Sequence, residues 1–272
     1  MKERVTITIS DDLLKLIDNQ VDGTTVKNRS HAIELAISKS VRNKELTQGI
    51  ILAGANYEIN QDGKKIPTFM AMVNGKTIIE HNVKEFKKQG ITDILISVYY
   101  KKELIKELFG DGSNLGVNIK YIEEKTPSGT AGTIKKAAEY IKGPFVVCNG
   151  DGLRKINLKQ FFDFHKKQGT LATIGLTTVN DPQNYGVVVL NGSRVHSFVE
   201  KPRSNIPSNL INAGVYIFEP EVLKHFPEGY GKLETDVFPK LAKNEDFAGY
   251  VFFGKWNYVR SEEQLHKAIK DW

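Results

Sequence analysis

The chain has 272 residues, 40% of them hydrophobic, enough for a small domain and a large one with a packed core. No apolar run reaches the length of a membrane span, and the N-terminal region lacks a signal-peptide pattern, so the sequence predicts a cytoplasmic protein with no membrane contact. The net charge of +6 does not by itself indicate a nucleic-acid partner, because residues 1–46 hold eight basic against seven acidic side chains.

Residues 4–10 predict a strand, and two helices are expected between it and residue 46. Hydrophobic side chains alternate with Arg4, Thr6 and Thr8, which is the period of a half-buried strand. A first helix is expected after Ser10 and a second around residues 28–30. This unit is too small for its own core and its strand has no partner. We therefore expect a homodimer or higher homo-oligomer in which two strands pair as an antiparallel ribbon.

The order and length of these elements resemble the ribbon-helix-helix repressors, and the resemblance covers most of residues 1–46. In that family the ribbon lies in the major groove of DNA. The resemblance implies that Arg4, Thr6 and Thr8 read base edges of double-stranded DNA, and that backbone amides around Arg29 and Ser30 bind a phosphate. The alternative is a strand that serves dimerisation only.

Residues 47–272 follow a different pattern, in which short apolar runs alternate with helical segments. This alternation predicts an α/β domain with a mainly parallel, Rossmann-like sheet covered by helices. After residue 151 predicted strands dominate. Strands are expected at 50–53, 94–99, 118–123, 144–148, 172–178, 186–190, 195–200, 212–218 and 248–253, and helices at 78–89, 102–109 and 130–141.

Residues 49–67 open the large domain with an apolar run, a turn of small residues and a polar loop that closes on Pro67. This is the layout of a first strand that delivers a ligand loop. Six further stretches follow in order: Val-Asn-Gly-Lys at 73–76, Ser-Gly-Thr-Ala-Gly at 128–132, Cys-Asn-Gly-Asp at 148–151, Phe-Val-Glu-Lys-Pro at 198–202, Leu-Ile-Asn-Ala-Gly-Val-Tyr at 210–216 and Leu-Glu-Thr-Asp-Val-Phe-Pro-Lys at 233–240. Together they resemble the sugar-nucleotidyltransferases, which add a nucleotide to a sugar phosphate and release pyrophosphate.

The resemblance implies a set of ligand-binding residues, each with a structural alternative. The helix start at 129–132 would lie against a nucleotide, or be no more than a tight turn. Asp151 would hold Mg²⁺ if a nucleotide binds, or cap a turn. Glu200 and Lys201 would contact the hydroxyls and phosphate of a sugar phosphate, or form an exposed salt bridge. Asn212 would contact the sugar from the opposite wall, or hydrogen-bond to the edge of the sheet. The implied nucleotide and sugar contacts are Leu52, Ala53, Gly54, Gly129, Thr130, Ala131, Glu200, Lys201 and Asn212.

Three departures from the family pattern fall on its chemistry. The family loop reads Gly-X-Gly-Thr-Arg, whereas this chain has no arginine there and places Glu58 where phosphate oxygens are expected. Thr68 stands at the family's lysine, with Lys64 and Lys65 as nearby substitutes, and Tyr258 stands at its second metal-binding aspartate. Because phosphoryl transfer depends on charge neutralisation, we assign no catalytic residue.

These features favour a dimeric DNA-binding protein, a transcriptional regulator, with a catalytically impaired nucleotidyltransferase-like domain. That domain would sense a nucleotide or sugar nucleotide, or mediate assembly. The alternative is an active sugar-1-phosphate nucleotidyltransferase that uses its N-terminal domain for dimerisation or autoregulation.

Overall fold

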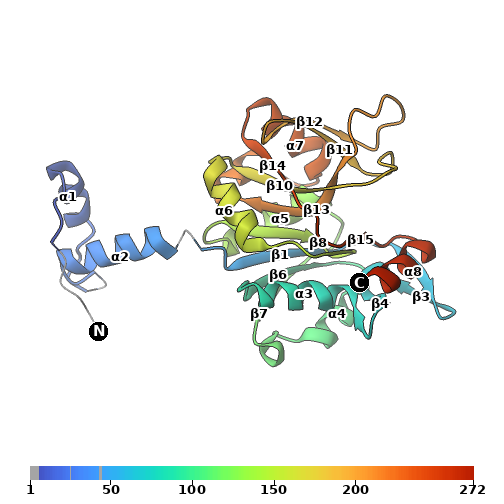
Figure 1. Ribbon diagram of the computed structural model, residues 1–272. Coiled ribbons are helices and arrows are strands. Elements are labelled where there is room, and N and C mark those ends of the chain that lie inside the picture. Colours follow the sequence, from blue (N-terminus) through green and yellow to red (C-terminus); the bar gives the residue numbers. More distant parts are fainter. Residues whose placement is uncertain (1–5, 25, 43–44) are drawn as a thin grey trace. The chain divides into compact units, whose positions relative to one another are not determined.

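The computed structural model describes residues 6–24, 26–42 and 45–272. The chain divides into two compact units, Met1–Glu45 and Leu46–Trp272 (Figure 1). The smaller unit contains two helices, α1 (Asp11–Asp18) and α2 (Arg29–Arg42). No strand forms over residues 6–10, the described part of the predicted strand. A strand needs a hydrogen-bonded neighbour, and the described part of this unit offers none.

The core of the smaller unit is minimal. Ile17 and Ala32 are its buried apolar side chains among the described residues, whereas Leu13, Leu16 and Leu35 are exposed. The helices themselves match the sequence prediction, because helix formation requires only local hydrogen bonds and one apolar stripe.

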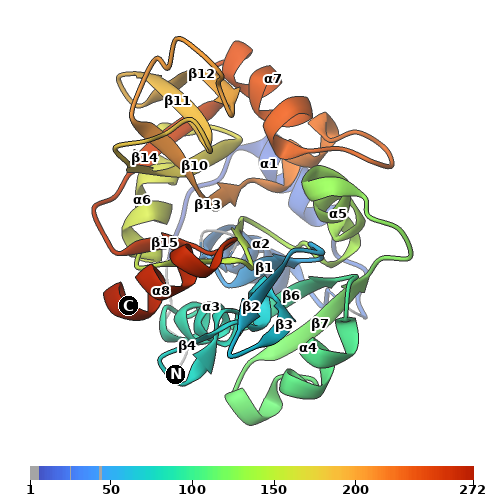
Figure 2. The ribbon, with the colours of Figure 1, turned by 90° about the vertical axis from the view of Figure 1, so that its right-hand side faces the viewer.

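A nine-stranded mixed sheet runs through the larger unit (Figures 1 and 2). In spatial order its strands are β10 (Ala172–Thr178), β14 (Phe247–Val251), β12 (Arg194–Glu200), β11 (Gly186–Asn191), β13 (Leu210–Phe218), β8 (Phe145–Asn149), β1 (Gln48–Ala53), β6 (Asp93–Val98) and β7 (Asn118–Glu123). The strands β8, β1, β6 and β7 are parallel, as predicted. The prediction of a mainly parallel sheet fails beyond β8, because β13, β11 and β12 run antiparallel to their neighbours and β14 pairs in parallel only with β10.

Helices cover both faces of this sheet: α3 (Ile78–Lys88), α4 (Lys102–Phe109) and α6 (Leu158–Gln168) on one face, α5 (Gly129–Lys136) and α7 (Phe238–Lys243) on the other. The alternation along β1 explains the two layers. Ile51 and Ala53 join the core beneath α3, α4 and α6, whereas Ile50 joins the core beneath α5 and α7. A strand buried on both faces reads as the continuous apolar run seen in the sequence.

Three short two-stranded sheets accompany the large sheet (Figure 2). They are β2 (Glu58–Gln61) with β3 (Lys64–Pro67), β4 (Met72–Val73) with β5 (Lys76–Thr77), and β9 (Gly152–Arg154) with β15 (Trp256–Tyr258), after which α8 (Glu262–Asp271) ends the chain. The pair β9–β15 brings the C-terminal segment to residues that directly follow β8. No helix among the residues described above is long and apolar enough to cross a membrane.

Candidate functional site

Two cavities meet at the carboxyl ends of β1 and β8, where ligands bind in open α/β sheets. The larger cavity has a volume of about 360 Å³ and the smaller about 110 Å³. Asn149, Glu234 and Arg260 line both, so they mark the junction between them.

The larger cavity is lined by the turn after β1 and by the start of α5. Leu52, Gly54, Gly129 and Thr130 of the predicted nucleotide residues line it. The predicted contacts Ala53 and Ala131 are buried and do not line it.

The glycines of α5 serve packing against the segment 229–231. A Cβ on Gly129 would lie 2.3 Å from the carbonyl oxygen of Gly231, and one on Gly132 would lie 2.2 Å from that of Gly229. The amide of Ala131 donates to Gly231 O at 2.9 Å, so it is not free for a ligand. The tight-turn alternative therefore accounts for the missing side chains in this stretch.

Glu124 is a wall residue of the larger cavity that the sequence reasoning missed. Its side chain is buried and its Oε1 lies 3.2 Å from Lys136 Nζ. Lys136 also donates to Ser128 Oγ. A buried carboxylate with one cationic partner at a cavity wall keeps acceptor capacity for a ligand. The signal available in the sequence was its position directly after the strand at 118–123.

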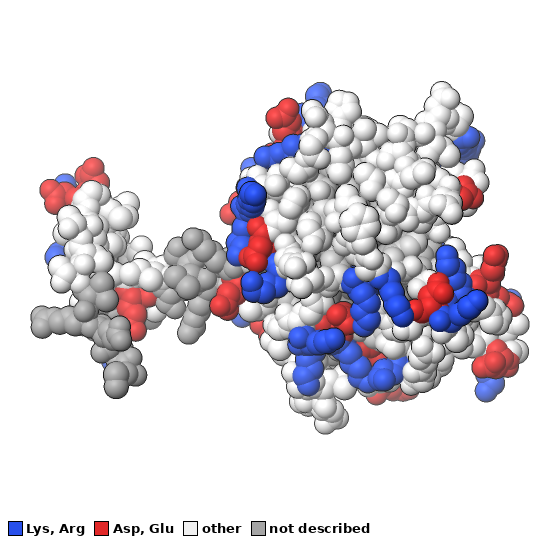
Figure 3. All heavy atoms as spheres, in the orientation of Figure 1, with Lys and Arg blue, Asp and Glu red and all other residues white. Residues whose placement is uncertain are grey.

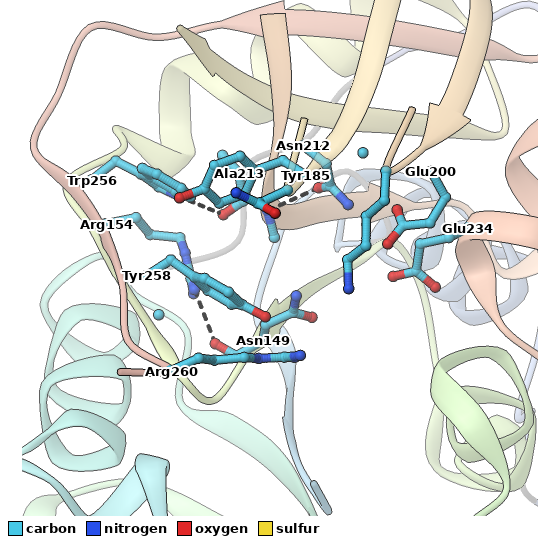
Figure 4. A pocket seen from close by; sticks show the side chains of 15 residues that line it. Asn149, Arg154, Tyr185, Glu200, Asn212, Ala213, Glu234, Trp256, Tyr258 and Arg260 are labelled. Atoms are coloured by element: carbon cyan, nitrogen blue, oxygen red, sulfur yellow. Dashed lines mark hydrogen bonds between the residues drawn. The ribbon is translucent and has the colours of Figure 1, made fainter. Parts of the chain in front are cut away.

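The smaller cavity is lined by the predicted sugar residues Glu200, Lys201 and Asn212, of which Figure 4 labels Glu200 and Asn212. The Asn212 amide is already engaged, since its Nδ2 donates to Tyr216 Oη at 2.9 Å and its Oδ1 accepts from the Gly214 amide at 2.9 Å. Asn212 therefore contributes to the shape of the cavity wall, and both ends of its amide are already hydrogen-bonded within the protein.

Glu200 and Glu234 place two carboxylates beside each other in this cavity (Figure 4). Burial, together with the negative charge of Glu234, raises the pKa of Glu200 above its usual value. Tyr185 and Trp256 add aromatic surface, with ring centroids 5.5 Å apart. A polar floor with aromatic walls suits a hydroxyl-rich ligand.

Asp151 lines the larger cavity and pairs with Arg260 of the junction. Asp151 Oδ2 accepts from Arg260 Nε at 3.2 Å and lies 3.1 Å from Arg260 Nη2. The guanidinium carbon of Arg260 lies 3.9 Å from the ring centroid of Tyr57 and 4.8 Å from that of Tyr258. Burial and the charge of Asp151 raise the pKa of Tyr258 well above its usual value, so its phenol stays protonated.

The local strand pairing explains this cluster. Tyr258 pairs with Gly152 across β9 and β15, and the Val259 amide donates to Asp151 O at 3.2 Å. This register places Arg260 beside the Asp151 side chain.

The expectation that the negative charge of Glu58 would oppose a bound phosphate has to be corrected, because the Glu58 carboxylate is paired within the protein. Its carboxylate accepts from Lys101 Nζ at 2.8 Å and from Tyr100 Oη at 2.7 Å, and these hydrogen bonds lower the pKa of Glu58. Its charge is thus paired, and Glu58 does not line either cavity at the junction. Lys65 borders a separate groove with Arg260, whereas Lys64 lines none of these cavities, and Thr68 is buried.

The donor set around Asp151 does not fit a metal ion held by protein ligands alone. Across the described residues, no group of three or more His, Cys, Asp or Glu side chains could hold a metal ion. Asp151 is the one carboxylate at the end of β8, and a guanidinium already occupies it. A protonated Tyr258 is a poor ligand for a hard cation, which prefers carboxylate and carbonyl oxygens.

Four of the five residues predicted to contact DNA lie among the described residues. Arg4 lies outside the described residues, and Thr6, Thr8 and Ser30 are exposed. The Arg29 guanidinium forms an ion pair with Asp18 at 2.6 Å, and this ion pair links α2 to α1. Among the described atoms of the smaller unit, the face shown in Figure 3 has no continuous basic surface.

Comparison with known proteins gave consistent matches for the larger unit. The profile of the family described as Nucleotidyl transferase matches residues 64–271. Mannose-1-phosphate guanylyltransferase catalytic subunit beta of Danio rerio is 32% identical over 213 residues, 76% of this chain and 59% of that protein. Mannose-1-phosphate guanyltransferase of Saccharomyces cerevisiae is 32% identical over 77% of this chain and 60% of that protein. The chain thus spans about three fifths of the length of these curated relatives.

Solved structures give the same fold. A putative glucose-1-phosphate thymidylyltransferase from Bacillus anthracis, in complex with a sucrose, superposes with a TM-score of 0.74 at 22% identity, over 82% of this chain and 94% of that chain. HddC from Yersinia pseudotuberculosis complexed with GMP-PN superposes with a TM-score of 0.70 at 26% identity, over 83% of this chain and 99% of that chain.

These matches contradict the expectation of a DNA-binding transcriptional regulator with a catalytically impaired domain. The curated relatives that share about three quarters of the chain are named as enzymes. Nothing in the matches supports a ribbon-helix-helix domain at the N-terminus.

Proposed function

Because the chain belongs to the nucleotidyl transferase family, we propose that it transfers a nucleotidyl group from a nucleoside triphosphate to a sugar 1-phosphate, with GTP and mannose 1-phosphate as the first pair to test. The observation that carries the proposal is the pair of cavities that meet at Asn149, Glu234 and Arg260. A nucleoside in the larger cavity and a sugar in the smaller one would bring their phosphates together at this junction.

The larger cavity favours guanine through Glu124. Guanine presents the N1–H and N2–H donors side by side, which a carboxylate can accept together. Uracil and thymine present one N–H between two carbonyl oxygens, and those oxygens would face the negative charge. Lys136 holds one oxygen of Glu124 at the wall.

The smaller cavity favours a sugar because its polar groups can each meet a hydroxyl. The Glu200 carboxylate would accept a hydrogen bond from a sugar hydroxyl, and Lys201, the next residue in the chain, would contact the phosphate. Lys201 adopts a left-handed backbone conformation with φ of 47°, which is uncommon for residues other than Gly, Asn or Asp.

The reaction joins an oxygen of the sugar 1-phosphate to the α-phosphorus of the triphosphate and breaks the bond from that phosphorus to the bridging oxygen, so pyrophosphate leaves. The attacking phosphate oxygen is already ionised, and the chain needs to supply positioning and positive charge. Arg260, Lys201 and Lys232 lie on the cavity walls to do so. Nucleotidyltransferases of this family typically use a divalent metal such as Mg²⁺, which adds charge neutralisation when bound.

The smaller unit, Met1–Glu45, would serve self-association of the enzyme. Its support is the exposed apolar surface on α1 and α2, with Leu16 61% and Ile37 52% exposed. Light scattering on the full chain is expected to show a dimer or larger oligomer, and Leu16→Glu to shift it towards monomer. A wild-type monomer at micromolar concentration would contradict this role.

The direct test of the reaction is incubation with GTP, mannose 1-phosphate and Mg²⁺, followed by chromatography for GDP-mannose and a colorimetric assay for pyrophosphate. Both products are expected in equal amounts. Other triphosphates and hexose 1-phosphates run in parallel would define the preferred pair. Product from none of the pairs, with folded protein, would overturn the proposal.

A further inference from the structure

We infer that Arg260, in place of a divalent ion held by the chain, is the cation that binds the phosphates of a nucleoside diphosphate sugar at the junction of the two cavities. The inference rests on the proposed function and concerns how that site holds its ligand. It predicts that binding of the sugar nucleotide does not depend on a divalent metal.

The guanidinium has free donors that face the junction. A guanidinium carries five N–H groups, and Arg260 donates from Nε to Asp151 Oδ2, while its Nη2 lies 3.1 Å from the same oxygen. Neither N–H group of Nη1 is used by Asp151, and the Arg260 side chain is 30% exposed. This leaves room for a bidentate contact with a phosphate, the geometry in which arginine binds phosphate most strongly.

Two aromatic rings hold the guanidinium in place. Tyr57 comes from the loop after β1 and Tyr258 from β15, so segments far apart in the chain position one side chain. Cation–π contacts are stronger for partly desolvated cations. Arg260 is thus preorganised, and binding a phosphate costs little side-chain entropy.

The charge balance of the cavities makes Arg260 decisive. The basic side chains that line them are Arg154, Lys201, Lys232 and Arg260, and the acidic ones are Glu124, Asp151, Glu200 and Glu234. Among these described residues Arg260 is the one basic side chain that lines both cavities. Without it the lining would carry a net negative charge and repel a diphosphate.

Asp151 has a changed role in this arrangement. Its carboxylate orients Arg260 and is not available to a metal ion unless the guanidinium moves away. Asp151 is therefore a positioning residue for the phosphate-binding cation.

The test is titration calorimetry of the full chain with GDP-mannose, once with Mg²⁺ and once with EDTA. For the wild type we expect Kd values within about threefold of each other. Arg260→Gln should weaken binding in EDTA by at least about tenfold, because a charged hydrogen-bond donor is lost. Arg260→Lys should retain part of the affinity. Arg203→Gln, an exposed arginine that lines neither cavity, is the matched control and should bind like the wild type.

The outcomes separate the two claims. Wild-type binding that appears only with Mg²⁺ would overturn the role of Arg260 and leave the proposed reaction standing. Equal affinity of wild type and Arg260→Gln in EDTA would also overturn it. Absence of binding in both conditions, together with absence of product in the assay for GDP-mannose, would overturn the proposed function. The wild-type comparison needs no variant, so it is decisive even if Arg260→Gln does not fold.

Discussion

Arg260 Nη2 lies 3.1 Å from Oδ2 of Asp151, although 109 residues separate the two in the chain. The pair joins the end of β8 to the segment after β15. The sequence resemblance implies that Tyr258, two residues before Arg260, stands at the family's second metal-binding aspartate. In that interpretation a protonated phenol and the Arg260 cation lie where the family has a carboxylate.

Restoring carboxylates should create a metal site. In the double variant Tyr258→Asp with Arg260→Gln, Asp151 loses its cation and gains a second carboxylate nearby, the ligand type that hard divalent ions prefer. We expect Mn²⁺ to bind at one site per chain, at least about tenfold more tightly than to the wild type. Electron paramagnetic resonance of free Mn²⁺ measures this, with Arg260→Gln alone as an intermediate. Equal Mn²⁺ affinity in all three proteins would refute this interpretation.

Glu124 should set the base preference. Replacement by Gln keeps the shape but offers an amide that accepts at one atom and donates at the other, so guanine loses one of two hydrogen bonds. We expect the ratio of kcat/KM for GTP over UTP to fall by about ten- to hundredfold in Glu124→Gln. Glu123→Gln is the control, because Glu123 faces Lys102 and Lys106 on the surface. An unchanged ratio would exclude Glu124 as the base reader.

Glu200 should make stability depend on pH. Its raised pKa means that the folded state disfavours the ionised form, so the stabilising contribution present below the usual carboxyl value is lost as pH rises through the higher folded pKa. Glu200→Gln is therefore expected to raise Tm more at pH 7.5 than at pH 5, while weakening binding of the sugar phosphate. Differential scanning calorimetry with Glu221→Gln, an exposed carboxylate, as the control tests this. A Tm lowered equally at both pH values would be the wrong outcome.

Gly132 should resist substitution because its neighbour is backbone. A Cβ there would lie 2.2 Å from Gly229 O, and moving the segment 229–231 would break its hydrogen bonds to α5. Gly132→Ala should cost about 1–3 kcal/mol of unfolding free energy. Gly54→Ala meets nothing closer than 3.4 Å and should cost much less. Chemical denaturation distinguishes the two, and equal stabilities would show that the segment adapts freely.

Sequence reasoning predicted the elements whose cause is local. The apolar run at 50–53 lies within β1, and the predicted strand at 118–123 matches β7. A strand buried on both faces is a continuous apolar run in the sequence, and a strand buried on one face alternates between apolar and polar residues, so both can be recognised directly. The second half of the sheet was predicted as strands but not as antiparallel, since hairpin pairing depends on partners that the pattern does not identify.

The site was harder to predict because its decisive contacts join distant residues. Glu58 was expected to oppose phosphate, but its carboxylate accepts hydrogen bonds from Lys101 and Tyr100, which lie 43 and 42 residues away in the chain. Arg260 was missed although it lies two residues from Tyr258, a spacing that places both side chains on one face of an extended segment. Whether the predicted ligand residues touch a nucleotide or sugar stays a prediction.

The proposed nucleotidyl transfer is tested most directly by the rate at which the full chain, with Mg²⁺, forms GDP-mannose and pyrophosphate from GTP and mannose 1-phosphate. We predict enzyme-dependent formation of both products in equal amounts, and a loss of at least about tenfold in kcat/KM for Arg260→Gln but not for Arg203→Gln. Products absent from every combination of triphosphate and hexose 1-phosphate, with a folded protein, would contradict it.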